Sequence, residues 1–387
     1  MRPLPRSVVA LGVVSLLTDV SSEMIYPLLP VFLTATLGAG PVFLGLIEGL
    51  AEAVASLSKI VAGGLSDRMP RRKPLVVAGY TLSSLARPLV ALAAAPWHVL
   101  LIRFADRVGK GVRGAPRDAL IATAVPAHEL GRAYGFHRAM DHLGAALGPL
   151  LASAALFLGA ELRVVFGLAL VPGLLSVLAL LVGVHEEPAA RVTRATDPAT
   201  ASGLGAPFYR YLGVLALFTL GNSSDAFLIL RAQQAGVPLP LVPLVWMLHS
   251  LVKAGASTSL GALSDRVGAR RAIGLGFGVY AAAYLGFAGV RGPLAATALF
   301  AVYALYHALV EGPERALVAR LAPPEARGRA FGLYHAVTGA MLLPASLLTG
   351  FVWQASGPAA AFGLGAALAG LAAAMLFWWV PEPDVAR

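Results

Sequence analysis

A group of charged residues lies inside an apolar stretch that is long enough to cross a membrane. Its basic members are Arg103, Arg107, Lys110 and Arg117. Their successive spacings of four, three and seven positions place them on one face of a helix, with Asp106 beside them. Charges at membrane depth are costly unless they face a partner or a water-filled cavity. The stripe is therefore either a set of ion pairs between helices or part of a binding site.

Two carboxylates, Asp19 and Glu23, lie one helical turn apart in the first apolar stretch. Counted at ~1.5 Å per residue from the N-terminal end, both lie at or just beyond the middle of a membrane. A carboxylate there can exchange a proton or a cation with a passing substrate, or can form a static ion pair with Arg103 or Arg107. We expect the first role for both acids and for Asp225, the counterpart of Glu23 in the second half of the chain, which lies close to Asn222.

His307 and Glu311 form another pair with helical spacing. A histidine at mid-membrane can titrate between about pH 5 and 8, which suits proton coupling, although it can equally form a hydrogen bond between helices. As metal ligands, Glu23, Asp225 and His307 are weak candidates, because their spacing is not specific. The chain contains no cysteine, which excludes disulfides and thiolate metal sites.

The composition indicates a membrane protein that crosses the bilayer many times. Of 387 residues, 58% are hydrophobic and only 13% are charged. The formal net charge is +10, but the basic residues gather in short loops between apolar runs, so they indicate topology and not a nucleic-acid partner. The excess of arginine over lysine, with abundant Ala, Leu and Gly, is typical of a GC-rich bacterial genome.

Each membrane helix needs about 20 mostly apolar residues, and the sequence predicts twelve. We place them at residues 7–36, 42–65, 74–95, 98–122, 133–158, 161–184, 208–231, 239–263, 272–290, 294–320, 330–353 and 358–380. The loops after the second, eighth and tenth helices are rich in Lys and Arg, whereas most loops on the other side have none. By the positive-inside rule, we expect both termini to be cytoplasmic. Together with the bacterial composition, this predicts a location in a bacterial inner membrane.

The chain consists of two similar halves. The segment GGLSDRMPRRK at 63–73 matches GALSDRVGARR at 261–271, and SSE at 21–23 matches SSD at 223–225. We predict one six-helix bundle at residues 1–184, a polar linker at 185–207 and a second bundle at 208–387. Two parallel six-helix repeats that handle a substrate between them are typical of transporters.

The loop after the second helix carries a motif that resembles the major facilitator superfamily. The matching residues are Gly63, Leu65, Asp67, Arg68, Arg71, Arg72 and Lys73, with Asp265, Arg266 and Gly268 in the second copy. Pro70 stands where the family usually has glycine. The resemblance implies an all-α membrane protein of twelve helices in two pseudo-symmetric bundles. It also implies that this loop takes part in gating, and that helices 1, 4, 7 and 10 line the cavity.

Two further segments are similar to family motifs. Arg103, Phe104, Asp106, Arg107, Gly109, Lys110 and Gly111 follow the pattern of the fourth helix, with charges where that pattern is usually neutral or small. Gly144, Gly148 and Pro149 resemble a motif of proton-driven exporters in the fifth helix, although the glycine pair that usually follows is replaced by leucines. Small residues at this spacing are also common in ordinary helix packing.

The sequence therefore favours a secondary transporter that works by alternating access and exports a small molecule in exchange for protons. Export of a metal ion or metal chelate and uptake or exchange of an organic anion stay open, as does a membrane enzyme or receptor on a transporter fold. The chain lacks a G-x-x-x-x-G-K-[ST] nucleotide loop, so we expect no ATP drive. No Ser/His/Asp or metal-hydrolase arrangement stands out, so we expect no enzyme activity. We expect no cofactor beyond the proton gradient. Its partners would be the lipid bilayer and the substrate, with the protein a monomer.

Overall fold

The computed structural model describes residues 4–126, 129–186, 203–323 and 326–381. Within these ranges, it does not describe the side chains of residues 60, 67, 68, 258 and 261–265. The expected gating residues Asp67, Arg68 and Asp265 thus lie, with their side chains, outside the described part, as does most of the expected linker. The described residues form helices and connecting turns without a strand.

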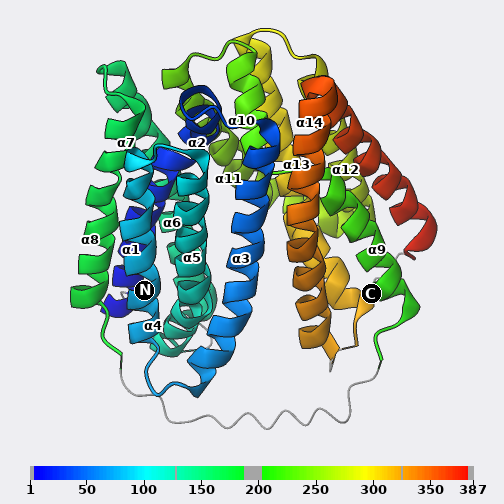
Figure 1. Ribbon diagram of the computed structural model, residues 1–387. Coiled ribbons are helices and arrows are strands. Elements are labelled where there is room, and N and C mark those ends of the chain that lie inside the picture. The colour runs from blue at the N-terminus through cyan, green and yellow to red at the C-terminus, as the bar shows by residue number, and fades with distance from the viewer. Residues whose placement is uncertain (1–3, 127–128, 187–202, 324–325, 382–387) are drawn as a thin grey trace. The chain divides into compact units, whose positions relative to one another are not determined.

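The first half of the chain forms eight α-helices and three short distorted helices (Figure 1). In chain order they are α1 (Arg6–Ile25), η1 (Tyr26–Leu28), α2 (Leu29–Val31), η2 (Phe32–Thr36), α3 (Pro41–Arg68), α4 (Lys73–Ala86), η3 (Arg87–Leu92), α5 (Pro96–Ala124), α6 (Leu130–Phe157), α7 (Leu162–Leu168) and α8 (Leu170–Gly183). These counts refer to the described ranges. Pro27 and Pro30 lack backbone N–H donors, which accounts for the distorted turns that follow α1.

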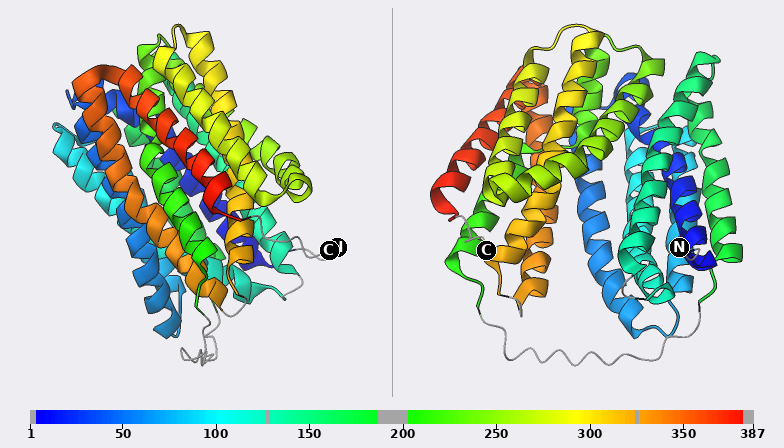
Figure 2. Two further views of the ribbon diagram at one scale, coloured as in Figure 1. Left: turned by 90° about the vertical axis from the view of Figure 1, so that its right-hand side faces the viewer. Right: turned by 180° about the vertical axis from the view of Figure 1, so that it is seen from behind.

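The second half follows the same plan (Figure 2). Its helices are α9 (Ala206–Gly221), α10 (Asp225–Gln234), η6 (Leu239–Leu241), α11 (Val242–Val267), α12 (Ala269–Gly289), α13 (Pro293–Leu321) and α14 (Arg327–Trp379). Proline in the first turn begins α5 and α13, where its missing N–H removes no helical hydrogen bond. Gly357 has a φ of 85° and divides α14 into two helices.

The described residues contain ten helical spans that are long and apolar enough to cross a membrane. The span at Arg327–Trp379 counts as two, because the chain turns at Gly357. Helix α5 has 29 residues, which is long enough to cross, but its charged residues make it less apolar than the others. With these two additions the structure has the twelve membrane helices that the sequence predicts, and the predicted all-α membrane fold is confirmed.

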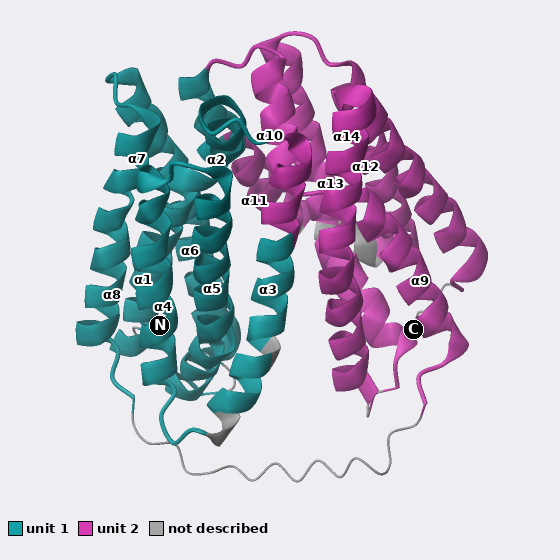
Figure 3. Ribbon diagram, in the orientation of Figure 1, with its two compact units in different colours: residues 1–39, 50–194, 239–247 teal, residues 40–49, 195–238, 248–387 magenta. Residues whose placement is uncertain are grey.

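The chain divides into two compact units (Figure 3). Unit 1 comprises residues 1–39, 50–194 and 239–247, and unit 2 comprises residues 40–49, 195–238 and 248–387. The division therefore falls within α3 and within α11, in the first third of each helix. In unit 1, α1 packs along α6 and α8, and α4 packs along α5. In unit 2, α14 packs along α9 and α12, and α12 also packs along α13.

The two cores differ in their side chains. One core cluster of unit 1 is mainly aliphatic and includes Val8, Leu11 and Val76. Unit 2 instead buries a group of aromatic side chains on α12 and α13 that are almost inaccessible to solvent, namely Phe277, Tyr280, Tyr284, Phe287, Phe300 and Tyr303. Tyrosines bring hydroxyl groups into the interior, and buried hydroxyls are stable when they find hydrogen-bond partners.

Candidate functional site

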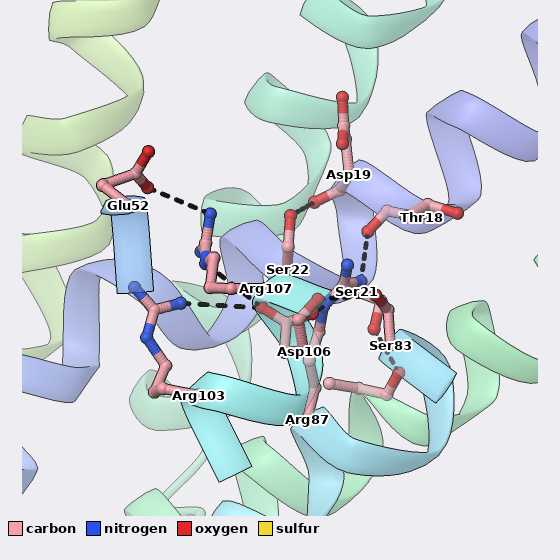
Figure 4. Close-up of polar contacts among 11 residues, drawn as sticks. Thr18, Asp19, Ser21, Ser22, Glu52, Ser83, Arg87, Arg103, Asp106 and Arg107 are labelled. Carbon is pink, nitrogen blue, oxygen red and sulfur yellow. Dashed lines mark hydrogen bonds and ion pairs between the residues drawn. The ribbon is translucent and has the colours of Figure 1, made fainter. Parts of the chain in front are cut away.

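Asp106 on α5 is a buried carboxylate that lies among three arginines (Figure 4). The Arg87 Nε atom is 2.7 Å from Asp106 Oδ1, and both side chains are buried. The other carboxylate oxygen, Oδ2, is 3.5 Å from Arg107 Nε and 3.8 Å from Arg103 Nη1. The structure thus brings together three residues that the sequence places side by side. Arg87, from η3, is a partner that the sequence reasoning did not include in the site.

Hydrogen bonds to backbone carbonyls hold this group against neighbouring helices. Arg87 Nη1 donates to the carbonyl of Thr18 on α1 at 3.0 Å. Ser83 Oγ on α4 donates to the carbonyl of Asp106 at 3.0 Å. Removing one member of a buried ion pair leaves an uncompensated charge, which costs about 3–5 kcal/mol. The pair between Arg87 and Asp106, with these two hydrogen bonds, therefore connects α1, α4, η3 and α5 at membrane depth.

The rest of the cationic stripe is divided between paired and open positions. Arg107 Nη1 is 3.2 Å from Glu52 Oε1 on α3, and the Glu52 side chain is 42% exposed. Arg117 donates to its neighbour Asp118 at 2.8 Å. Lys110 is exposed and makes no hydrogen bond or ion pair with any residue that the structure describes. The stripe therefore presents one open ammonium group on the surface of unit 1.

The two acids of α1 lie where α6 has glycines. A Cβ atom at Gly144 would stand 2.6 Å from the Leu16 carbonyl oxygen and 2.9 Å from the Cβ of Asp19. One at Gly148 would stand 2.7 Å from the Val20 carbonyl oxygen and 2.8 Å from the Cβ of Glu23. Helix α1 can approach this closely only because both α6 positions lack a side chain. The exporter-like motif and the α1 acids are thus parts of one contact.

Asp19 and Glu23 differ in what their carboxylates meet. The Trp246 Nε1 atom donates to Glu23 Oε2 at 2.8 Å, and the Trp246 ring lies 5.2 Å from that of Tyr26. Asp19 is partly buried, and its carboxylate has no hydrogen-bond or ion-pair partner among the described residues. Neither acid forms the ion pair with Arg103 or Arg107 that the sequence leaves open. Asp19 is thus an open carboxylate at membrane depth, whereas Glu23 is held in place.

A second acidic group in unit 1 lies on α6. Asp141 accepts a short hydrogen bond from Ser15 Oγ on α1. It also lies 3.5 Å from His137 Nδ1 and 3.4 Å from Arg138 Nη1. With these three neighbours, Asp141 is bound within the contact between α1 and α6, and we assign it a structural role.

In unit 2, the acid Asp225 begins a new helix after a break in the chain. Helix α9 ends at Gly221 and α10 begins at Asp225. Tyr280 donates to the carbonyl of Gly221 at 2.9 Å, and Asn222 Nδ2 donates to the hydroxyl of Tyr306 at 3.2 Å. The hydroxyl of Tyr303 donates to Asp225 Oδ1 at 2.6 Å. We call the four tyrosines Tyr280, Tyr284, Tyr303 and Tyr306 the tyrosine bracket.

The fourth member of the bracket, Tyr284, shares a hydrogen bond of 3.2 Å with Ser223 Oγ. Two tyrosines come from α12 and two from α13, and all four are buried. Discontinuous helices in transporter folds expose backbone groups that can bind substrates or ions. Here the tyrosine hydroxyls form hydrogen bonds with polar groups on both sides of the break. The bracket therefore fixes the position of Asp225 and Asn222.

The expected pair of His307 and Glu311 also comes together, with a third partner. Glu311 Oε1 is 3.4 Å from His307 Nδ1 and 2.5 Å from Lys253 Nζ on α11. The ring of His249, on α11, stacks on that of Tyr303, with centroids 5.3 Å apart. Among the residues that the structure describes, no three His, Asp or Glu side chains form a group that could hold a metal ion.

Comparison with known proteins identifies the family. The family model of the Major Facilitator Superfamily matches residues 11–313 and 212–387, which together cover nearly the whole chain. The chain belongs to the major facilitator superfamily. It is 34% identical over 386 residues to an uncharacterized MFS-type transporter of Methanocaldococcus jannaschii, and the match covers 97% of this chain and 96% of the relative. The family and the fold are those of transporters.

Two other similarities are narrower. This major facilitator superfamily protein is 30% identical to the multidrug resistance protein MdtH of Photorhabdus laumondii over 139 residues, which cover 36% of this chain and 34% of MdtH. Its fold resembles the crystal structure of a bacterial homolog of the human lysosomal transporter Spinster. That likeness has a TM-score of 0.76 at 18% identity and covers 96% of this chain and 95% of the other. At this identity, the likeness concerns the fold alone.

The loop motif of this family member lies where α3 ends and α4 begins. Gly63 lies in α3, and a Cβ atom there would meet only Ala115 at 3.8 Å. Arg71 is exposed, and the backbone N–H of Arg72 donates to Glu186 Oε1 at 2.7 Å. In the second copy, Arg266 is exposed in the last turn of α11. Pro149 continues α6 without ending it.

The partners that sequence reasoning missed in this transporter come from other helices. Arg87 and Trp246 lie far from Asp106 and Glu23 in the sequence, so no spacing connects them. The four tyrosines were missed as well, although a signal for them exists, because Tyr280 and Tyr284 are four residues apart and Tyr303 and Tyr306 three apart. Those spacings put each pair on one helix face. Because buried hydroxyls need hydrogen-bond partners, two tyrosines on one face of a membrane helix indicate that polar groups lie on the neighbouring helix.

Proposed function

We propose that this protein is a secondary active transporter that works by alternating access and exports a small molecule in exchange for protons. We place it in a bacterial inner membrane with both termini in the cytoplasm. The observation that carries the proposal is Asp19, a partly buried carboxylate at membrane depth without a hydrogen-bond or ion-pair partner in the described ranges. An ionisable residue inside a membrane helix is by default a candidate for proton or ion transfer.

The other acids of unit 1 are less available for proton exchange. Asp106 has Arg87 at 2.7 Å, with Arg103 and Arg107 close by. Glu23 accepts a hydrogen bond from Trp246. Asp19 lies one turn from Glu23, over the glycines of α6, so a small movement of α1 against α6 would change the surroundings of both acids. We therefore assign proton exchange to Asp19 and a supporting role to Glu23.

The direction of transport rests on a partial similarity. MdtH, whose name describes a multidrug resistance protein, matches 36% of this chain. Gly144, Gly148 and Pro149 resemble the exporter-like motif, and the first two lie against the α1 acids. Together these observations support efflux.

The test is a flux assay with purified protein in liposomes that contain a pH-sensitive dye. Lipophilic cations, divalent metal ions, citrate and phosphorylated metabolites would be added in turn. One of them should drive proton movement in the wild type. We expect Asp19→Asn to abolish that signal while the protein stays folded. Glu161→Gln, which removes an exposed carboxylate at the start of α7, is the matched control and should leave the signal unchanged.

Proton movement of wild-type size in Asp19→Asn would contradict the proposal. Anion flux without proton movement would favour a second candidate function, the uptake or exchange of an organic anion. The open ammonium group of Lys110 supports that alternative, because it lies on the same helix as Arg103 and Arg107 and lacks a described partner. Anion flux without proton movement that is lost in Lys110→Gln would establish it.

A further inference from the structure

A groove of about 880 Å³ lies on unit 1 between α4 and α8. Most of its wall is apolar and consists of Pro74, Val77, Ala78, Leu82, Leu85 and Leu181. Leu82, Leu85 and Leu181 are between 40% and 50% exposed, so the groove opens to the outside of the helix pair. The charged residues of the wall gather at one end, next to the loop between α3 and α4.

The groove has the length of one membrane leaflet. From Lys73 to Leu85 the groove follows α4 for twelve residues, or roughly 18 Å at the helical rise. Half of the hydrocarbon core of a bilayer is about 15 Å thick. The groove therefore begins at the membrane surface with charged groups and ends near the midplane among leucines. This is the distribution of polarity along a single phospholipid.

The charged end is built by two reciprocal helix caps. The carboxylate of Glu186 accepts hydrogen bonds from the backbone N–H groups of Arg72 and Lys73, both at 2.7 Å, at the start of α4. The ammonium group of Lys73 donates to the carbonyls of Leu181 at 3.0 Å and Val184 at 2.6 Å, at the end of α8. The Glu186 carboxylate thus binds free N–H groups at the start of α4, and the Lys73 ammonium group binds free carbonyls at the end of α8. The mouth of the groove is a fixed structure.

The basic side chain that remains at the mouth is Arg71. It is exposed and makes no hydrogen bond or ion pair with the residues that the structure describes. The ring of His185 is also exposed at the groove. Because Glu186 and Lys73 are engaged with backbone groups, the mouth presents an available guanidinium group, which binds phosphate well.

We propose that the groove binds an anionic phospholipid, with an acyl chain between α4 and α8 and the phosphate on Arg71. The apolar wall, its leaflet length and the open guanidinium at the surface end carry this assignment, which does not depend on the transported substrate. A neutral lipid could fill the apolar wall equally well. The distinguishing feature is therefore a preference for an anionic headgroup at this position.

Native mass spectrometry of the full-length protein in detergent tests the site. The probes are phosphatidylglycerol, phosphatidylcholine and glycerol phosphate, added at equal concentrations. We expect preferential binding of phosphatidylglycerol, and about fivefold weaker binding in Arg71→Gln, which corresponds to ~1 kcal/mol for one arginine near a membrane surface. Arg291→Gln removes an exposed arginine from unit 2 and should bind as the wild type does.

A second variant tests the acyl chain independently of the charge. Ala78→Trp fills the exposed middle of the groove and should also lower phosphatidylglycerol binding, with thermal stability in detergent checked alongside. Equal binding of phosphatidylglycerol to the wild type, Arg71→Gln and Ala78→Trp would overturn the proposal. Equal binding of phosphatidylcholine would overturn the headgroup preference, and displacement of the lipid by glycerol phosphate would overturn the role of the acyl chain.

Discussion

Two segments with nearly the same sequence have different backbone structures in the two halves. Residues 21–23 are Ser-Ser-Glu and residues 223–225 are Ser-Ser-Asp. The first segment lies inside the continuous helix α1, which runs to Ile25. The second segment lies at the break between α9 and α10, with Asp225 as the first residue of the new helix. The serine pair by itself therefore does not break a helix.

The preceding residues and the packing account for the difference. Gly221 and Asn222 precede Ser223, whereas Asp19 and Val20 precede Ser21. Of these four residues only glycine is distinctly unfavourable inside a helix, so Gly221 is the sequence difference that favours the break. In unit 2 the tyrosine bracket supplies hydrogen bonds to the interrupted chain. In unit 1 the glycines of α6 let the unbroken helix α1 pack closely against α6.

The comparison separates the functions of the two acids. Ser21 aligns with Ser223, so Asp19 aligns with Gly221, and the open carboxylate of unit 1 has no acidic counterpart in unit 2. Asp225 instead has a fixed hydrogen-bond partner, Tyr303. We infer that the contacts of α1 change during transport, whereas the contacts of the break between α9 and α10 stay the same.

The largest effect is expected from filling the α1–α6 contact with Gly148→Ala. The new Cβ atom would meet the Val20 carbonyl oxygen at 2.7 Å and the Glu23 Cβ at 2.8 Å. Overpacking of this kind costs about 1–3 kcal/mol, so the free energy of unfolding should fall by that amount. Titration with sodium dodecyl sulfate in mixed micelles measures it.

The matched control is Gly135→Ala on the same helix, where a Cβ atom meets nothing within 4 Å. There the better helix propensity of alanine should leave the protein as stable or raise its stability by up to about 1 kcal/mol. If Gly148→Ala behaves like Gly135→Ala, α1 does not depend on the glycines, and the proposed contrast with unit 2 fails.

A smaller loss is expected from Tyr303→Phe in the bracket. The change removes the hydroxyl that donates to Asp225 at 2.6 Å and preserves the ring. Hydrogen bonds between membrane helices contribute on average about 0.6 kcal/mol and at most about 1.7 kcal/mol. We expect a loss of unfolding free energy within this range, measured by the same titration.

Tyr211→Phe is the control for the bracket, because Tyr211 is a fully buried tyrosine of unit 2 whose hydroxyl has no hydrogen-bond partner in the described part of the chain. Its change to phenylalanine should cost nothing. Equal effects of the two variants would mean that the bond to Asp225 does not hold the break.

The membrane helices of this protein could be predicted from sequence because each needs only a long apolar run, and all twelve appear in the part of the chain that the structure describes. The group of Arg103, Asp106 and Arg107 could also be predicted, because all three lie within five residues of one helix. The contacts of Arg87 and Trp246 could not, since they depend on how separate helices are rotated. The repeats likewise gave no sign that the division into two units falls within α3 and α11.

The smallest effect, and the most direct test of the comparison, comes from the aligned serines Ser22 and Ser224. Ser224 Oγ accepts a hydrogen bond from the backbone N–H of Ala226 at 3.3 Å and so caps α10. Ser22 Oγ only donates to the Asp19 carbonyl within α1, at 3.2 Å. Loss of an N-cap costs about 0.5 kcal/mol at the lower end of its range, which fits this long bond.

We therefore expect Ser224→Ala to lower the free energy of unfolding by about 0.5 kcal/mol. Ser22→Ala should have no effect or be slightly stabilising, because alanine favours the middle of a helix and the lost bond competes with the helical one. Each variant is measured against the wild type in mixed micelles. Equal losses from both serines would mean that the cap does not distinguish the two segments, and the break would then depend on Gly221, Asn222 and the tyrosines alone.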